Sequence, residues 1–131
     1  MSDILTKPKV VIAEKIKQEI AEQEELEAQV VVHCQIQTPS NMPMGVRIWP
    51  TTFLLDNDSQ HQSKLLHHEN IPMVPQWKEI PPNTSYTFTL FFSALPKSCA
   101  KFHMVELIPQ SGGFEALNLL RNKLDVYYVK I

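Results

Sequence analysis

The chain has 131 residues, enough for one domain with a substantial core, and its 44% hydrophobic and 20% charged residues are typical of a globular protein. A formal net charge of −2 gives no electrostatic attraction to nucleic acid or to anionic lipid, so we expect neither as a partner. No apolar run approaches the roughly 20 residues that span a bilayer, and the first residues lack the apolar segment of a secretory signal. We therefore expect a single domain over residues 1–131, with no membrane association and a cytoplasmic location.

Two interpretations compete for the N-terminal third. Residues 14–27 contain six glutamates, and isoleucines recur every fourth residue before and within them, which favours a helix. Pro8, however, is followed by β-branched residues that begin like a strand, and pairing with residues 30–37 would extend the sheet. We expect this hairpin, with a short helix over residues 13–27 as the alternative.

The next part of the chain predicts short strands separated by turns. Residues 30–37 are rich in β-branched side chains and end at a polar turn. Residues 46–55 form a second strand, but Pro50 cannot donate to a sheet ladder, so we expect a bend at its middle. Asp and Ser side chains at 56–59 favour a turn, after which residues 64–69 return as the second strand of a hairpin.

The clearest strand is SYTFTLFFS, residues 85–93, in which apolar and hydroxyl side chains alternate with the period of two that strands impose. Before it, four prolines in residues 71–83 predict an extended and irregular connection. After it, residues 101–108 and 125–131 form strands on either side of a glycine loop. The predicted core is the apolar face of these strands: Val32, Cys34, Ile36, Ile48, Leu54, Tyr86, Phe88, Leu90, Phe92, Phe102 and Met104.

Short strands about ten residues apart, without long helices between them, predict an all-β antiparallel sandwich of about seven strands. The succession TTFLLDNDSQHQSKLL, IPPNTSYTFTLFFSALPKS and KFHMVEL resembles the middle and late strands of bacterial immunoglobulin-like β-sandwich domains of unknown function. This resemblance covers residues 46–108 and implies a fold, with no catalytic motif. The chain departs from antibody-type domains at Lys97, where they place tyrosine, and at Cys99, which precedes its strand.

The cysteines and histidines give the main chemical alternatives. We expect Cys34 to be a buried thiol and Cys99 a loop thiol without a disulfide, and the neighbouring His33 points to the opposite face of its strand from Cys34. His61, His67 and His68 lie around the predicted hairpin with carboxylates nearby, and imidazoles with a carboxylate bind zinc. A metal-binding protein or metal-dependent enzyme that uses His61 with His67 or His68 is the alternative function.

The sequence contains no glycine-rich phosphate loop, no G-x-S-x-G, no H-E-x-x-H and no C-x-x-C motif, so we predict no catalytic and no cofactor-binding residue. The favoured function is a non-enzymatic binding or assembly module. Its candidate interaction residues are Trp77, among prolines, and Phe91, on the hydroxyl-rich face of its strand. We expect a protein partner or a weak homodimer, formed through residues 125–131 or the face that carries Thr89 and Phe91, with a monomer as the alternative.

Overall fold

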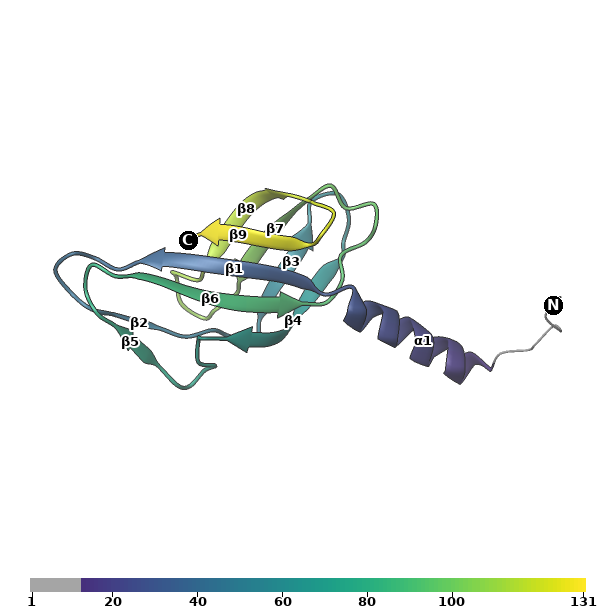
Figure 1. Cartoon of the computed structure of the whole chain (residues 1–131), viewed down its shortest axis with the longest axis horizontal. Helices are drawn as coiled ribbons and strands as arrows, with labels where there is room; N and C mark the ends of the chain where they lie inside the picture. Colours follow the sequence, from purple (N-terminus) through teal and green to yellow (C-terminus); the bar gives the residue numbers. More distant parts are fainter. Residues whose placement is uncertain (1–12) are drawn as a thin grey trace.

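A computed structural model describes residues 13–131 and shows one helix followed by nine strands (Figure 1). The predicted strand start at Pro8 lies outside the described residues. The elements are α1 (Glu14–Glu27), β1 (Val30–Gln37), β2 (Met44–Val46), β3 (Thr52–Asp56), β4 (Gln62–Glu69), β5 (Lys78–Ile80), β6 (Ser85–Phe92), β7 (Lys101–Glu106), β8 (Glu115–Leu120) and β9 (Val126–Lys130). The predicted mostly β fold is therefore confirmed.

Seven strands form a single mixed sheet in the order β8-β7-β3-β4-β6-β1-β9, in which β1 and β9 are parallel and the other neighbours are antiparallel. The two edge strands, β8 and β9, are joined only by residues 121–125, so the sheet must curl until its edges approach each other. The result is a nearly closed barrel (Figure 1). The predicted antiparallel, immunoglobulin-like sandwich is not confirmed, because there is one curled sheet and β9 returns beside β1 in the parallel direction.

A polar network fixes the short connection between β8 and β9. The Arg121 guanidinium donates two hydrogen bonds to Asp125, from Nε at 2.5 Å and from Nη2 at 3.0 Å. Arg121 Nη1 also donates to the Pro96 carbonyl at 2.7 Å, and the Tyr127 hydroxyl donates to Asp125 at 2.9 Å. Bidentate pairs of this kind add directional specificity. The network anchors the turn of residues 121–125 to the loop between β6 and β7, which contains Pro96. This anchoring directs β9 toward β1.

The barrel interior is filled as the strand alternation predicts. Of the eleven predicted core residues, ten are buried, including Phe88, Leu90 and Phe92 of β6. Tyr86 is only half-buried, because its hydroxyl donates to the Asn70 carbonyl at the rim of the barrel. Burial of its oxygen without a partner would be costly, which explains the outward position.

The predicted N-terminal hairpin is wrong, and the helical alternative for residues 13–27 is observed as α1. The two edges of β1 are already occupied by β6 and β9, so no edge is left for another strand. The helix propensity of residues 14–27 therefore determines the conformation of this segment. Helix α1, the one helix in the described residues, extends away from the barrel and is too short and too polar to be a membrane span (Figure 1).

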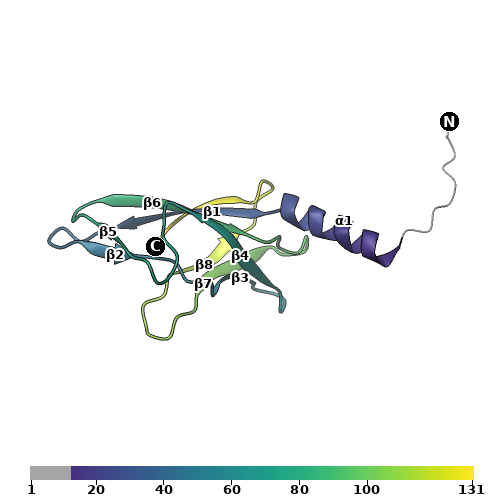
Figure 2. The same cartoon turned by 90° about the horizontal axis from the view of Figure 1, so that it is seen from below.

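The end of the barrel opposite to α1 carries two appendages (Figure 2). Strands β2 and β5 pair there as a separate two-stranded ribbon, and the loop of residues 107–114 connects β7 to β8. The predicted strand 46–55 is interrupted around Pro50, as expected, so its first part joins the ribbon and its second part becomes β3. The ribbon and the loop form the walls of a cleft.

Candidate functional site

A cleft of about 340 Å³ lies between the β2–β5 ribbon and the β7–β8 loop. We call it the tryptophan cleft and define it by Arg47, Trp49, Trp77, Glu106, Gln110 and Phe114. It contains both tryptophans of the chain. Concave sites lined by aromatic groups with a few polar groups are the usual binding sites of proteins.

The Trp77 side chain is 62% exposed, although one side of its ring packs against the backbone of β2. A Cβ atom at Gly45 would lie 3.2 Å from Trp77 Cε3, so the indole rests directly on the backbone of β2. Arg47 lies two residues after Gly45, just beyond the end of β2 at Val46. Its Cζ is 3.9 Å from the centroid of the Trp77 ring. One face of the indole is covered by β2, and the exposed area belongs to the rest of the ring.

Arg47 is wedged between the two tryptophans. Its Cζ is 5.5 Å from the Trp49 ring, and Nη1 is 3.4 Å from the Pro75 carbonyl oxygen, a long hydrogen bond. Arg47 Nε is buried and has no hydrogen-bond partner in the part of the chain that the structure describes. Stacking of a guanidinium on indole rings stabilises both groups, so Arg47 fixes the two rings relative to each other.

Glu106 connects the two walls of the cleft. It is 8% exposed, and its two carboxylate oxygens accept backbone hydrogen bonds from Trp49 at 3.0 Å and from Phe114 at 3.1 Å. Burial raises the pKa of Glu106 above its ordinary value of 4.5, against the opposing effect of these two N–H groups and of the nearby Arg47 charge. Because each oxygen holds one backbone N–H group, we assign Glu106 the role of positioning Trp49 and Phe114 relative to each other.

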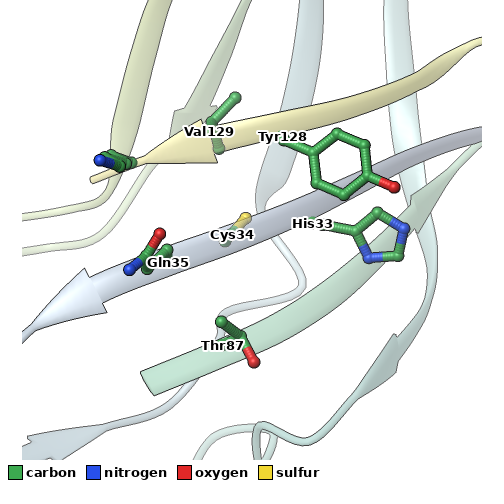
Figure 3. Close-up of a pocket in the computed structure, with 7 residues that line it drawn as sticks. His33, Cys34, Gln35, Thr87, Tyr128 and Val129 are labelled. Atoms are coloured by element: carbon green, nitrogen blue, oxygen red, sulfur yellow. The ribbon is translucent and has the colours of Figure 1, made fainter. Parts of the chain in front are cut away.

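A second surface is the outer face of the sheet formed by β9, β1 and β6. The His33 ring stacks on Tyr128 with centroids 4.9 Å apart (Figure 3). His33 Nδ1 is 2.8 Å from Thr89 Oγ1. A shallow hollow of about 150 Å³ lies beside these rings, between Gln35 and Thr87. Tyr128 is 79% exposed. We call the face that carries Val31, His33, Thr89, Phe91 and Tyr128 the outer sheet face.

The structure does not bring the three predicted metal-binding histidines together. His61 Nε2 is 3.0 Å from both Ser63 Oγ and the Ala94 carbonyl, at the beginning of β4. At about 3.3 Å per residue, His67 lies roughly 20 Å farther along the strand, where its ring packs against Phe91. His68 Nδ1 is 2.7 Å from the Ile71 carbonyl. Among residues 13–131, no group of three or more His, Cys, Asp or Glu side chains is placed to hold a metal ion.

Both cysteines are buried free thiols. Cys34 is 1% exposed in the core, on the opposite face of β1 from the half-buried His33, which confirms that the two cannot form a dyad. Burial raises the pKa of Cys34 to about 12, so its thiolate is strongly disfavoured. Cys99 lies in a loop, as predicted, but that loop is packed against the core.

The two predicted interaction residues belong to different surfaces. Trp77 forms the tryptophan cleft, whereas Phe91 is half-buried on the outer sheet face, 5.3 Å from the His67 ring. Sequence reasoning missed the contributions of Arg47 and Glu106. A signal existed for Arg47, because the segment RIW places it on the same strand face as Trp49. Nothing in the sequence indicated that Glu106 would lie beside them.

Comparison with protein-family models, with curated proteins and with solved structures finds no match to this chain. The resemblance to immunoglobulin-like domains therefore stays a prediction.

Proposed function

We propose that the protein is a non-enzymatic binding module whose ligand occupies the tryptophan cleft. The observation that carries this proposal is the exposure of Trp77, an indole that the backbone of Gly45 and the guanidinium of Arg47 hold in one orientation. Large exposed aromatic side chains at concave sites are characteristic of binding surfaces. Because the ring is held before a ligand arrives, binding costs less side-chain entropy.

The Trp77 ring can contribute a substantial part of the binding free energy. A tryptophan buries about 150–250 Å², so coverage of its exposed part removes on the order of 100 Å² from water, which is worth about 2–3 kcal/mol. Truncation of such an anchor commonly costs more than about 1 kcal/mol of binding free energy. We therefore expect ligand binding to depend strongly on Trp77.

The chemistry of the cleft supports binding over catalysis. Among residues 13–131, no histidine or cysteine lines it, and its carboxylate Glu106 already accepts two backbone hydrogen bonds. A general base must come within hydrogen-bond reach of the substrate proton, whereas Glu106 is only 8% exposed. The groups that remain are aromatic rings, the Arg47 guanidinium and the side chains of Gln110 and Ser111, which can recognise a ligand by stacking and hydrogen bonding.

The test is a binding screen with three proteins: the wild type, Trp77→Ala and Leu124→Ala. Leu124 is 83% exposed in the turn between β8 and β9, far from the cleft, and serves as the control. Each protein is applied to an array of random 12-residue peptides and to an array of oligosaccharides. Spots that bind wild type and Leu124→Ala but not Trp77→Ala support the proposal. If every spot that binds wild type also binds Trp77→Ala equally, the cleft is not the binding site.

We also propose self-association as a weak homodimer through the outer sheet face. Tyr128 is the observation that favours it, since a 79% exposed tyrosine stacked on His33 forms an aromatic surface on the outer sheet face. Tyrosine is enriched at the centre of protein interfaces, and a two-fold dimer is the commonest homo-oligomer. The free edge of β9 adjoins this face and adds unpaired backbone groups.

Light scattering over a concentration series tests the dimer. We expect the mass to rise from 15.1 kDa toward twice that value for wild type and for Met42→Ala, whose exposed side chain lies in the β1–β2 loop. The rise should be shifted to higher concentration in Tyr128→Ala. A mass fixed at 15.1 kDa at millimolar concentration would refute the dimer and leave the cleft proposal unaffected.

A further inference from the structure

We propose that helix α1 packs on the outer face of strands β3, β7 and β8 of a second copy of this chain. This contact goes beyond the proposed function of the tryptophan cleft and is separate from the outer sheet face. It follows from an exposed apolar sheet surface, an exposed helix on the same chain, and the opposite charges of the two.

The outer face of β3, β7 and β8 is apolar at most of its positions. Alternate residues of β3 and β7 are buried in the core, so Phe53, Leu55 and Val105 point outward and are half-buried. On β8, Leu117 and Leu120 are 53% and 68% exposed. We call the surface formed by these five side chains the apolar sheet face. Polar residues usually occupy the solvated face of a sheet, so an apolar outer face indicates a docking surface.

Helix α1 is exposed along the part whose side chains the structure describes. Ile16 and Ile20, four residues apart and therefore on one side of the helix, are 50% and 49% exposed. All residues from 13 to 20 are exposed, and α1 extends away from the barrel (Figure 1). A helix of 14 residues is marginally stable in water and gains most of its stability from packing of its apolar side. We therefore expect both isoleucines to be covered in the assembled protein.

The dimensions of the two elements match, but they belong to different copies. The 14 residues of α1 span about 21 Å, and the six residues of β7 span about 20 Å. A helix packed on a sheet is a usual arrangement in which both bury their apolar sides. Only residues 28 and 29 join α1 to β1, and β3 and β7 lie on the opposite side of the barrel from β1 (Figure 2). A second copy must therefore supply the helix.

Charge favours the apolar sheet face over a second α1 helix as the partner. Six glutamates and two lysines give α1 a formal charge of −4, whereas residues 28–131 carry eight Lys and Arg and seven Asp and Glu, a formal charge of +1. Lys64 of β4 and Lys101 of β7 are exposed and pair with residues of the apolar sheet face, where they outnumber the acidic Glu115 of β8. Two α1 helices side by side would instead place like charges together, which is unfavourable.

Paramagnetic broadening between copies tests this contact. A nitroxide spin label is attached to Gln18→Cys on α1 of a protein without ¹⁵N, since the native Cys34 and Cys99 are buried. This protein is mixed with ¹⁵N-labelled wild type, so the label can broaden signals only through contacts between copies. We expect the amide signals of β3, β7 and β8 to broaden more than those of β1 and β6.

Exposed residues on both partners provide the variants. Leu117→Gln/Leu120→Gln in the ¹⁵N copy, or Ile16→Gln/Ile20→Gln in the spin-labelled copy, should raise the concentration of half-maximal broadening at least about tenfold. Met42→Gln, in the exposed β1–β2 loop, is the control and should behave as wild type does. At about 1 M salt, where the Debye length is about 3 Å, the broadening should also weaken. Circular dichroism of each variant verifies the fold.

Three results would overturn the proposal. The first is the absence of broadening between copies at millimolar concentration. The second is broadening that Leu117→Gln/Leu120→Gln does not reduce, which would place α1 on another surface. The third is broadening of α1 signals that strengthens with salt, which would identify a pair of helices. The tryptophan cleft and the outer sheet face are tested through other residues, so their proposals are unaffected by these results.

Discussion

Replacement of Glu106 tests whether the tryptophan cleft is held together as the structure indicates. The carboxylate accepts backbone N–H groups of Trp49 and Phe114, one from each side of the cleft, at 3.0 and 3.1 Å. A hydrogen bond to a charged group contributes about 1.5–3 kcal/mol, and a buried donor left unpaired costs about 1–3 kcal/mol. The burial that raises the pKa of Glu106 offsets part of this stabilisation. We therefore expect Glu106→Ala to lower the free energy of unfolding by about 2–4 kcal/mol.

Glu106→Gln provides the graded comparison. Its amide oxygen can accept one N–H group, but its NH₂ group would face the other donor, so we expect about half the loss. The matched control is Glu115→Gln, because Glu115 lies on the next strand and is exposed. That change should stay within about 0.5 kcal/mol of wild type. The assay is urea denaturation, followed by tryptophan emission and by circular dichroism.

The pH dependence gives an independent check of the same group. The pKa of Glu106 is raised in the folded state, so the folded protein binds a proton more tightly than the unfolded chain does. The free energy of unfolding should therefore have a component that is present at pH below 4.5 and is lost as pH rises through the raised pKa. This component should be absent in Glu106→Gln. The reasoning is refuted if Glu106→Ala and Glu115→Gln have the same stability and Glu106→Gln has the pH profile of wild type.

Three further predictions concern other parts of the molecule. Phe88→Ala should lower the free energy of unfolding by about 3–5 kcal/mol in chemical denaturation, because Phe88 is 2% exposed in the core, and a loss below about 1 kcal/mol would contradict that placement. Gly45→Ala should change the tryptophan emission, since its Cβ would lie 3.2 Å from Trp77 Cε3, yet cost less than about 1 kcal/mol of stability; an unchanged spectrum would show that the ring does not rest there. Neither Cys34 nor Cys99 should react with a disulfide reagent at pH 8 in the folded protein, whereas both should react in urea, and rapid native reaction of either would contradict its burial.

Strand propensity and alternation were sufficient to predict most of the sheet. The segment VVVHCQIQ is β1 over the predicted residues, and the alternation of SYTFTLFF assigned Phe88, Leu90 and Phe92 to the interior. The sequence did not predict elements whose conformation depends on tertiary contacts. Strand β8, with the sequence EALNLL, has helix-favouring residues and no strict alternation, and it was not predicted. Its pairing with β7 overrides those local preferences.

Neither the closure of the sheet nor the candidate site could be predicted, because both depend on contacts between residues far apart in the sequence. The parallel pairing of β9 with β1 joins residues about 95 positions apart, such as Val31 and Val126, and no local pattern indicates it. The tryptophan cleft likewise combines Arg47, which follows β2, with Glu106, at the end of β7. Trp77 could be nominated from its proline-rich surroundings, because exposure near prolines is a local property. The residues that complete the cleft around Trp77 could be identified only from the structure.

The most direct test of the tryptophan cleft as a binding site is an ¹H–¹⁵N spectrum of protein labelled at tryptophan, recorded during titration with a ligand that binds the wild type on the arrays. We expect two indole N–H signals that both move and saturate together, because Trp49 and Trp77 line one cleft. The same titration of Glu106→Ala should give smaller shifts, since the two walls are no longer held together. Indole signals that stay fixed in the wild type at a saturating concentration of that ligand would contradict the claim that this cleft is the binding site.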